Sequence, residues 1–508
     1  MLTRRRFLGY SVLFPALFAP RPLLASGTGQ APASAAEPPV RLAILGSVYH
    51  VGSNLQSIAD RFLMGYPFEG DWHIPNVQVV SLYVDALAPK FGGPMEFAQT
   101  LERSRAAAAR RSTGTSPAQP AQPAPSNQPA APHEHTEIGE PHPPLAQSVT
   151  PRFGRRGLTA EAPETLGPTS DLSVERSRQF GFRLCRSIPE ALRCGGDRLA
   201  VDAVLTVVEQ GDYPKNDKGQ ILLPCYDFFE QCVQVFEEER RAVPYFNHKQ
   251  LSFSFTEARQ MVATAKRLGF PLLAGSSLPV TWRLPDVDIP MGARVDEVVM
   301  VGVGAFDGMD FDALEAMQCM IERRSGGETG VKAVQLLEGD DVWAAGRAGR
   351  WSKELLSSAL SRSDTPLGLT LLDGRTQDLV GSGVLPQLVK NPAAYCIEYA
   401  DGTRATLLML NGAVMDFNIS ARVAGHGLVS TQFFLPPTPN VTDTACLAAK
   451  IAQMFITRSV PYPVERTLLT SGLLEACLES KRRLNQRLET PHLSLSYRPP
   501  AESQYADA

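Results

Sequence analysis

The sequence lacks several features that would assign it quickly to a class of protein. Its 508 residues contain neither a C-x-x-C pair nor a G-x-S-x-G motif, so a common zinc site and the serine nucleophile of α/β-hydrolases are not indicated. The net charge of −4 gives no electrostatic footprint for nucleic acid. Beyond the N-terminus no apolar run approaches the ~18 residues that a membrane span needs. No repeat of about 20–50 residues occurs, which argues against a solenoid or a propeller.

What remains is the composition of an ordinary globular protein. Hydrophobic residues make up 44% of the chain and charged residues 20%, which excludes a disordered or fibrous chain. At roughly 100–200 residues per domain, this length predicts at least two domains, each with a core of its own.

The N-terminus predicts export. Arg4 and Arg5 precede an apolar stretch from Phe7 to Pro20, and small residues up to Ala35 follow, as a signal peptidase requires. This pattern is typical of a twin-arginine signal, so residues 1–35 are predicted to be a signal peptide read by the twin-arginine export machinery. The protein is then periplasmic or otherwise exported, without a permanent membrane span. An uncleaved membrane anchor is the alternative.

The eight cysteines show no metal-ligand spacing. A chain that folds in the cytoplasm before export does so under reducing conditions, which disfavour a disulfide framework. We therefore predict that the cysteines are buried small hydrophobic residues.

Strand and helix patterns alternate from about residue 40 to residue 285. The strand-like runs 40–45 and 77–84, for example, flank a helical pattern over 54–64. Such alternation is typical of right-handed βαβ crossovers, so this region predicts a Rossmann-like domain with a doubly wound parallel sheet. A Pro/Ala-rich segment at about 105–165 interrupts the pattern. It has too few large apolar residues to form a core and is predicted to be a disordered insertion.

From about residue 286 to residue 490, strand-like runs outnumber helical ones. Asp401-Gly402 lies between two of these runs, and this dipeptide favours a tight hairpin. The region therefore predicts an α+β domain built on a largely antiparallel open sheet, which would bind the substrate or form oligomer contacts. Residues 491–508 form a tail.

A candidate dinucleotide site lies in the first domain. Gly46 ends the first strand, Gly52 closes the turn after it, and Asp85 ends the second strand. Glycines allow the backbone to approach a pyrophosphate, and the acid accepts hydrogen bonds from a ribose. Val48 and Val51 occupy the other glycine positions of the G-x-G-x-x-G fingerprint. A βαβ turn without a nucleotide is therefore an open alternative.

Short motifs between residues 171 and 320 resemble the glucose-fructose oxidoreductase, inositol dehydrogenase and rhizopine-catabolism (Gfo/Idh/MocA) family. They are Arg178 to Gly181 (RQFG), Ser187 to Leu192 (SIPEAL), Val201 to Val204 (VDAV) and Thr256 to Val262 (TEARQMV). The resemblance implies a tightly bound NAD or NADP and a sugar or cyclitol as the substrate. It also implies a C-terminal sheet of the kind that forms homo-oligomer interfaces.

The resemblance also suggests the catalytic residues. His248-Lys249-Gln250 falls where the family has its E-K-P motif, so Lys249 matches the active-site lysine, although its neighbours differ. The family's second motif, an Asp followed by a His at the head of a helix, falls at Asp307 to Asp312. Asp307 matches the acid, and Asp310 or Asp312 stands where the histidine is missing. The alternatives are a solvated loop lysine and acids that merely begin a helix.

Together these features predict an exported NAD(P)-dependent oxidoreductase for a sugar or cyclitol. Lys249 would relay a proton, with Asp307 and Asp312 assisting. Because no free nicotinamide pool exists outside the cytoplasm, the cofactor would be recycled within each catalytic cycle. The alternative is a non-catalytic carbohydrate-binding or scaffold protein, motivated by the altered glycine turn and the missing histidine.

Overall fold

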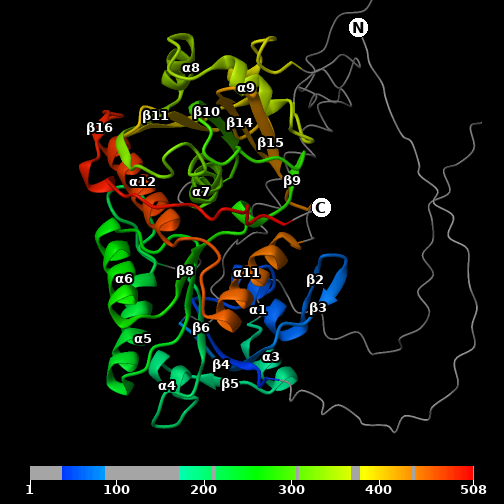
Figure 1. Cartoon of the computed structure of the whole chain (residues 1–508), viewed down its shortest axis with the longest axis vertical. Coiled ribbons are helices and arrows are strands. Elements are labelled where there is room, and N and C mark those ends of the chain that lie inside the picture. The colour runs from blue at the N-terminus through cyan, green and yellow to red at the C-terminus, as the bar shows by residue number, and fades with distance from the viewer. Residues whose placement is uncertain are drawn as a thin grey trace, which may run out of the picture. The chain divides into compact units, whose positions relative to one another are not determined.

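The computed structural model describes residues 37–85, 171–208, 213–304, 308–367, 378–436 and 441–506. The signal peptide predicted at 1–35 and the insertion predicted at about 105–165 lie outside these residues. Pro39–Ala508 form one unit, in which two large sheets are present (Figure 1). Among the described helices, none combines the length and the apolar character that crossing a bilayer requires.

The first sheet confirms the predicted doubly wound arrangement. Its described strands are all parallel and follow the order β5-β4-β1-β6-β7-β8. The order reverses between β1 and β6, and ligands of such sheets bind at this switch point, beyond the carboxyl ends of the strands. The strands are β1 (Val40–Gly46), β4 (Val77–Val84), β5 (Arg183–Cys185), β6 (Ala203–Val207), β7 (Tyr245–His248) and β8 (Leu272–Gly275).

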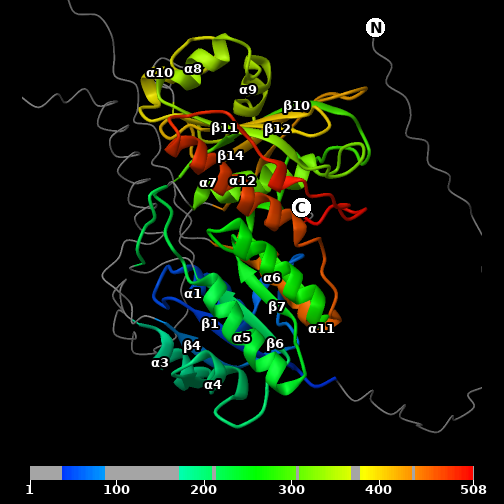
Figure 2. The ribbon, with the colours of Figure 1, turned by 90° about the vertical axis from the view of Figure 1, so that its left-hand side faces the viewer.

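Helices cover both faces of this sheet, which explains why β1 reads as an unbroken apolar run. Ala43 and Leu45 pack on the side of α4 (Ile188–Arg193), α5 (Cys225–Glu239) and α6 (Phe255–Leu268). Leu42 and Ile44 pack on the opposite side, with α1 (Asn54–Met64) and α11 (Asp443–Thr457) (Figures 1 and 2). The short helix α3 (Ser173–Phe180) precedes β5.

The second sheet is mixed but largely antiparallel, as predicted. Its described strands follow the order β16-β11-β12-β13-β10-β14-β15-β9, and among them β10 and β13 form the parallel pair. The Asp401-Gly402 hairpin joins β12 to β13, and Gly402 has a φ of 92°. The strands are β9 (Arg283–Leu284), β10 (Val295–Gly302), β11 (Val331–Glu338), β12 (Ala393–Tyr399), β13 (Arg404–Met409), β14 (Phe417–Val423), β15 (Gly427–Phe433) and β16 (Leu488–Glu489).

Two helices lie between the second sheet and the first. They are α7 (Met309–Ile321) and α12 (Glu465–Arg482), whereas α8 (Asp340–Arg347), α9 (Lys353–Leu360) and α10 (Leu385–Leu388) cover the far face (Figures 1 and 2). Helix α7 is buried along almost its whole length, including its acidic residues. Since buried charges need partners, this helix is where polar interactions between the two sheets concentrate.

The start of α6 is capped by a residue that is distant in the sequence. Ser254 precedes α6, but its side chain makes no capping hydrogen bond. Instead, Glu475 of α12 accepts a hydrogen bond of 2.7 Å from the Phe255 N–H, and Glu257 accepts one from the Ser252 hydroxyl. A carboxylate brought by the fold therefore replaces the local serine, and it also suits the positive end of the helix dipole.

The structure supports the prediction about cysteine. All eight thiols are free, six of them buried and two half-buried. A hairpin of β2 (Tyr66–Phe68) and β3 (Asp71–His73) was not predicted, because three-residue strands are too short to show an alternating pattern.

Candidate functional site

The structure brings Lys249 and Asp312 together. Lys249 directly follows β7 at the carboxyl edge of the first sheet, and Asp312 lies in the first turn of α7. Lys249 Nζ is 3.2 Å from Asp312 Oδ2, and their side chains are 18% and 10% exposed. Two of the three predicted catalytic residues therefore form an ion pair between the two sheets. Asp307 lies outside the described residues.

Asp310 has a different place. Its Oδ1 accepts hydrogen bonds from the N–H groups of Gly308 and Phe311 at the start of α7. Its Oδ2 accepts a hydrogen bond of 2.5 Å from the Tyr395 hydroxyl on β12. Asp310 thus caps the helix and ties it to the second sheet, while Asp312 pairs with Lys249.

The backbone at Lys249 is held in an unusual conformation. Its φ is +60°, in the left-handed region that costs a non-glycine residue roughly 1–2 kcal/mol. The Lys249 N–H donates a hydrogen bond of 2.9 Å to the carbonyl oxygen of Gly275, at the end of β8. Gly275 itself has a φ of +131°, and a Cβ there would lie 2.5 Å from Glu315 Oε1. Glycine is therefore required beside the lysine.

Glu315, one helical turn after Asp312, lies beneath this corner. Its Oε2 accepts hydrogen bonds from the Ser276 N–H (2.7 Å) and hydroxyl (3.0 Å). Its Oε1 accepts one of 2.7 Å from the Thr467 hydroxyl on α12. Burial raises the pKa of Glu315 to about 7, although these donors and the Arg466 guanidinium lower it. Sequence reasoning missed this residue. The feature that could have indicated it is an acid placed between apolar residues, Ala313-Leu314 before it and Ala316-Met317 after it.

The glycine turn is packed with its own side chains. A Cβ on Gly46 would lie 2.4 Å from Leu55 Cδ2, so this glycine lets α1 approach β1. Gly52 has a φ of +80°, and its N–H donates to Gln56 Oε1 at 2.6 Å. Val48 is buried within the turn.

Asp85 directly follows β4 in an exposed position, and two tyrosines reach its carboxylate. Tyr83 donates to Oδ1 at 2.9 Å, and Tyr213, from the segment after β6, donates to Oδ2 at 2.8 Å. Gly46 and Gly52 flank the turn after β1, and Asp85 follows β4, so all three lie at the carboxyl edge of the first sheet beside its switch point. The exposed Asp85 carboxylate has the acceptor chemistry that a ribose hydroxyl requires, and in that respect these residues fit a dinucleotide.

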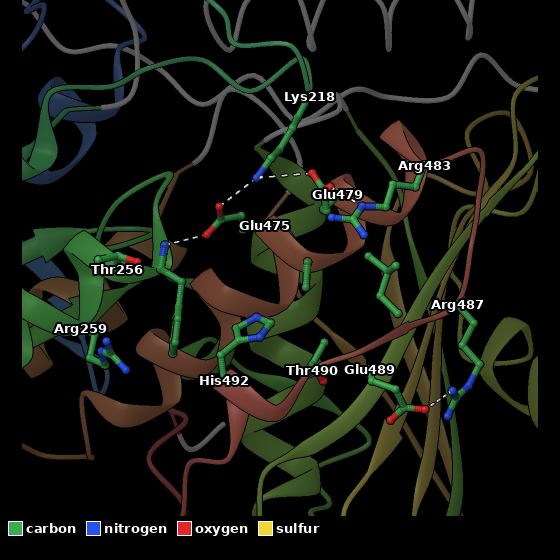
Figure 3. Close-up of a pocket in the computed structure, with 13 residues that line it drawn as sticks. Lys218, Thr256, Arg259, Glu475, Glu479, Arg483, Arg487, Glu489, Thr490 and His492 are labelled. Carbon is green, nitrogen blue, oxygen red and sulfur yellow. Dashed lines mark hydrogen bonds and ion pairs between the residues drawn. The ribbon is translucent and has the colours of Figure 1, made fainter.

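A cavity of about 520 Å³ lies elsewhere, at the seam between α6, α12 and β16 (Figure 3). Lys218 forms ion pairs with Glu475 and Glu479 across it. On the far side, Arg487 pairs with Glu489. The described catalytic and cofactor-binding residues predicted from the sequence do not line this cavity. Its ion pairs join α12 to the segment after β6.

No family model and no curated protein matches this sequence. Solved structures with similar folds include GenD2 from gentamicin A biosynthesis in complex with NAD, at 12% identity and a TM-score of 0.46, covering 92% of this chain and 99% of that one. Myo-inositol dehydrogenase from Lactobacillus casei, in complex with NAD(H) and myo-inositol, has 8% identity and a TM-score of 0.44, with coverage of 89% and 96%. The myo-inositol dehydrogenase of Corynebacterium glutamicum has 10% identity and a TM-score of 0.41, with coverage of 89% and 98%. At such identities the likeness concerns the fold, and a function for this chain has to come from its own residues.

Proposed function

We propose that this protein is an NAD(P)-dependent oxidoreductase that oxidises or reduces a hydroxyl-bearing carbon of a sugar or cyclitol. The observation that carries the proposal is the 3.2 Å contact between Lys249 Nζ and Asp312 Oδ2. It lies at the carboxyl edge of a doubly wound sheet, where ligands of such folds bind. A half-buried lysine in a left-handed backbone conformation, paired with an acid from the other layer, has the arrangement expected of a proton-handling pair.

The residues that would hold the cofactor are Gly46 and Gly52 in the turn before α1, with Asp85 at the ribose. When bound, the nicotinamide supplies hydride transfer. Lys249 and Asp312 then handle the proton. The Asp312 carboxylate would accept a proton from the Lys249 ammonium with which it pairs, and the amine so formed would take the hydroxyl proton of the substrate. The reverse direction returns the proton to the carbonyl oxygen along the same path.

We further propose that the protein is exported through the twin-arginine pathway and retains its cofactor through each catalytic cycle. Support comes from the pattern of residues 1–35 and from the absence of a nicotinamide pool outside the cytoplasm. A retained cofactor requires that each oxidation be followed by a reduction within the same active site.

A second candidate is a non-catalytic carbohydrate-binding or scaffold protein on the same fold. The specific observations in its favour are the buried Val48 in the glycine turn and the two tyrosine hydroxyls on Asp85. Under this alternative, Val48→Gly would raise the affinity for added NAD from almost nothing.

The deciding experiment uses full-length protein purified without added cofactor. After denaturation, released nicotinamide dinucleotide is quantified by mass spectrometry against protein. We expect near-stoichiometric NAD or NADP. Protein that is empty and also fails to bind either dinucleotide would refute the proposal and favour the binding protein.

Lys249→Ala then tests the site. We expect it to retain the dinucleotide but to lose turnover by about 10²-fold or more, the scale of general acid–base catalysis. Lys353→Ala, an exposed lysine at the start of α9, serves as the matched control. Full turnover by Lys249→Ala would remove Lys249 from the mechanism.

A further inference from the structure

Lys249 follows β7 of the first sheet, whereas Asp312 lies on α7. The buried carboxylate of Glu315 belongs to the same helix as Asp312 and also bonds the end of β8, on which the Lys249 backbone rests. Glu315 is 1% exposed and lies one helical turn after Asp312 on α7, on the same side of the helix. It also holds the end of β8 through the N–H and hydroxyl of Ser276. Since α12 joins the same carboxylate through Thr467, three elements meet on one side chain.

The link to Lys249 runs through Gly275. The Lys249 N–H is bonded to the Gly275 carbonyl, and the neighbouring His248 pairs with Gly275 across β7 and β8. Gly275 in turn packs directly on Glu315 Oε1, with no room for a Cβ between them. A shift of the Glu315 carboxylate would therefore shift Gly275, whose carbonyl oxygen accepts the hydrogen bond from the Lys249 N–H.

We propose that Glu315 is a positioning residue, which fixes the distance between Lys249 and Asp312 by binding the end of β8 to α7. As a role in catalysis this rests on the proposed function, although the geometric role does not. Three donors converge on its two oxygens, an arrangement that a carboxylate satisfies fully because both of its oxygens accept. Glutamine offers a single accepting oxygen, so Glu315→Gln keeps the volume but loosens the contact with either Ser276 or Thr467.

The test measures the chemical accessibility of Lys249 itself. Lysines of the full-length protein are labelled with a limiting amine-acylating reagent, and the labelling rate of the Lys249 peptide is followed by mass spectrometry. In Glu315→Gln we expect this rate to rise roughly fivefold, the factor expected when a partly exposed ion pair is released. Asp312→Asn should raise it similarly, because it removes the partner directly.

Glu297→Gln is the control. Glu297 lies on β10, is 9% exposed and pairs with Arg404, so its replacement leaves the contacts of Glu315 in place. If Glu315→Gln fails to fold, Ser276→Ala, which removes one donor to the same carboxylate, takes its place. We expect Glu297→Gln to label at the wild-type rate at Lys249.

The outcomes separate the two proposals. Wild-type labelling of Lys249 in folded Glu315→Gln overturns the positioning role, whether or not the protein carries a dinucleotide. Faster labelling in a protein that proves empty overturns the proposed function and leaves the positioning role intact. If the protein has dehydrogenase activity, Glu315→Gln should lower kcat several-fold and change KM little. The reason is that substrate binding does not depend on the distance between Lys249 and Asp312, whereas proton transfer does.

Discussion

The titration of Glu315 should couple the stability of this protein to pH. In the folded state burial raises the pKa of its carboxyl from 4.5 to about 7. The groups that face it are the hydroxyls of Ser276 and Thr467, with Arg466 on α12 and Tyr462 just before that helix. In the unfolded chain the carboxyl returns to its ordinary value.

The sign follows from counting protons. Between pH 4.5 and pH 7 the folded protein retains a proton on Glu315 that the unfolded chain has lost. The free energy of unfolding therefore decreases as the pH rises through this window. At about 1.4 kcal/mol per pH unit over two and a half units, the decrease amounts to roughly 3–4 kcal/mol. It is absent below the window and complete above it.

Urea unfolding at closely spaced pH values from 4.5 to 8 measures this directly, by comparing the wild type with Glu315→Gln. The variant lacks the titration, so its stability relative to the wild type should improve by roughly 3–4 kcal/mol across the range. Glu354→Gln, at an exposed ion pair with Arg422, controls for general charge effects. A difference between wild type and Glu315→Gln that stays constant with pH would refute the reasoning.

Two further substitutions test how the layers are joined. Arg466→Met leaves Glu322 buried without its ion-pair partner, so we expect the free energy of urea unfolding to fall by about 3–5 kcal/mol. The double variant Arg466→Met/Glu322→Leu should recover most of this loss. A loss below about 1 kcal/mol would contradict the buried pair. Gly46→Ala places a Cβ 2.4 Å from Leu55 Cδ2, and we expect a loss of about 1–3 kcal/mol in thermal unfolding, reduced when Leu55→Val relieves the overlap. An unchanged melting temperature in Gly46→Ala would show that α1 can retreat from β1 at no cost.

The fold could be predicted wherever local pattern and tertiary packing agree. The predicted bounds of α1 and β4 are those observed, at Asn54–Met64 and Val77–Val84, because each has a regular apolar period and a clear end. That Lys249 and Asp312 share one site was predicted from the family resemblance of their motifs and not from a local pattern, and the structure places the two side chains in contact.

Other features depend on partners far away in the chain. The cap of α6 comes from Glu475, 220 residues after Phe255, and Tyr213 reaches Asp85 across 128 residues. Glu315 is the clearest case. In the sequence it is one of three acids in the α7 segment, after Asp310 and Asp312, and only the positions of Ser276 and Thr467 show what it contacts. No local propensity encodes such a contact, because the free energy that favours it arises only when three elements have assembled.

Helix α11 has a consequence for how the chain is made. Together with α1 it covers one face of the first sheet, with apolar residues from Ala445 to Phe455, yet it is synthesised long after β8 has ended at Gly275. A nascent chain that already contains all six parallel strands therefore still exposes the part of this face that α11 will cover. Because exposed apolar surface favours aggregation, we expect a fragment that stops before Asp443 to aggregate more readily than the full chain.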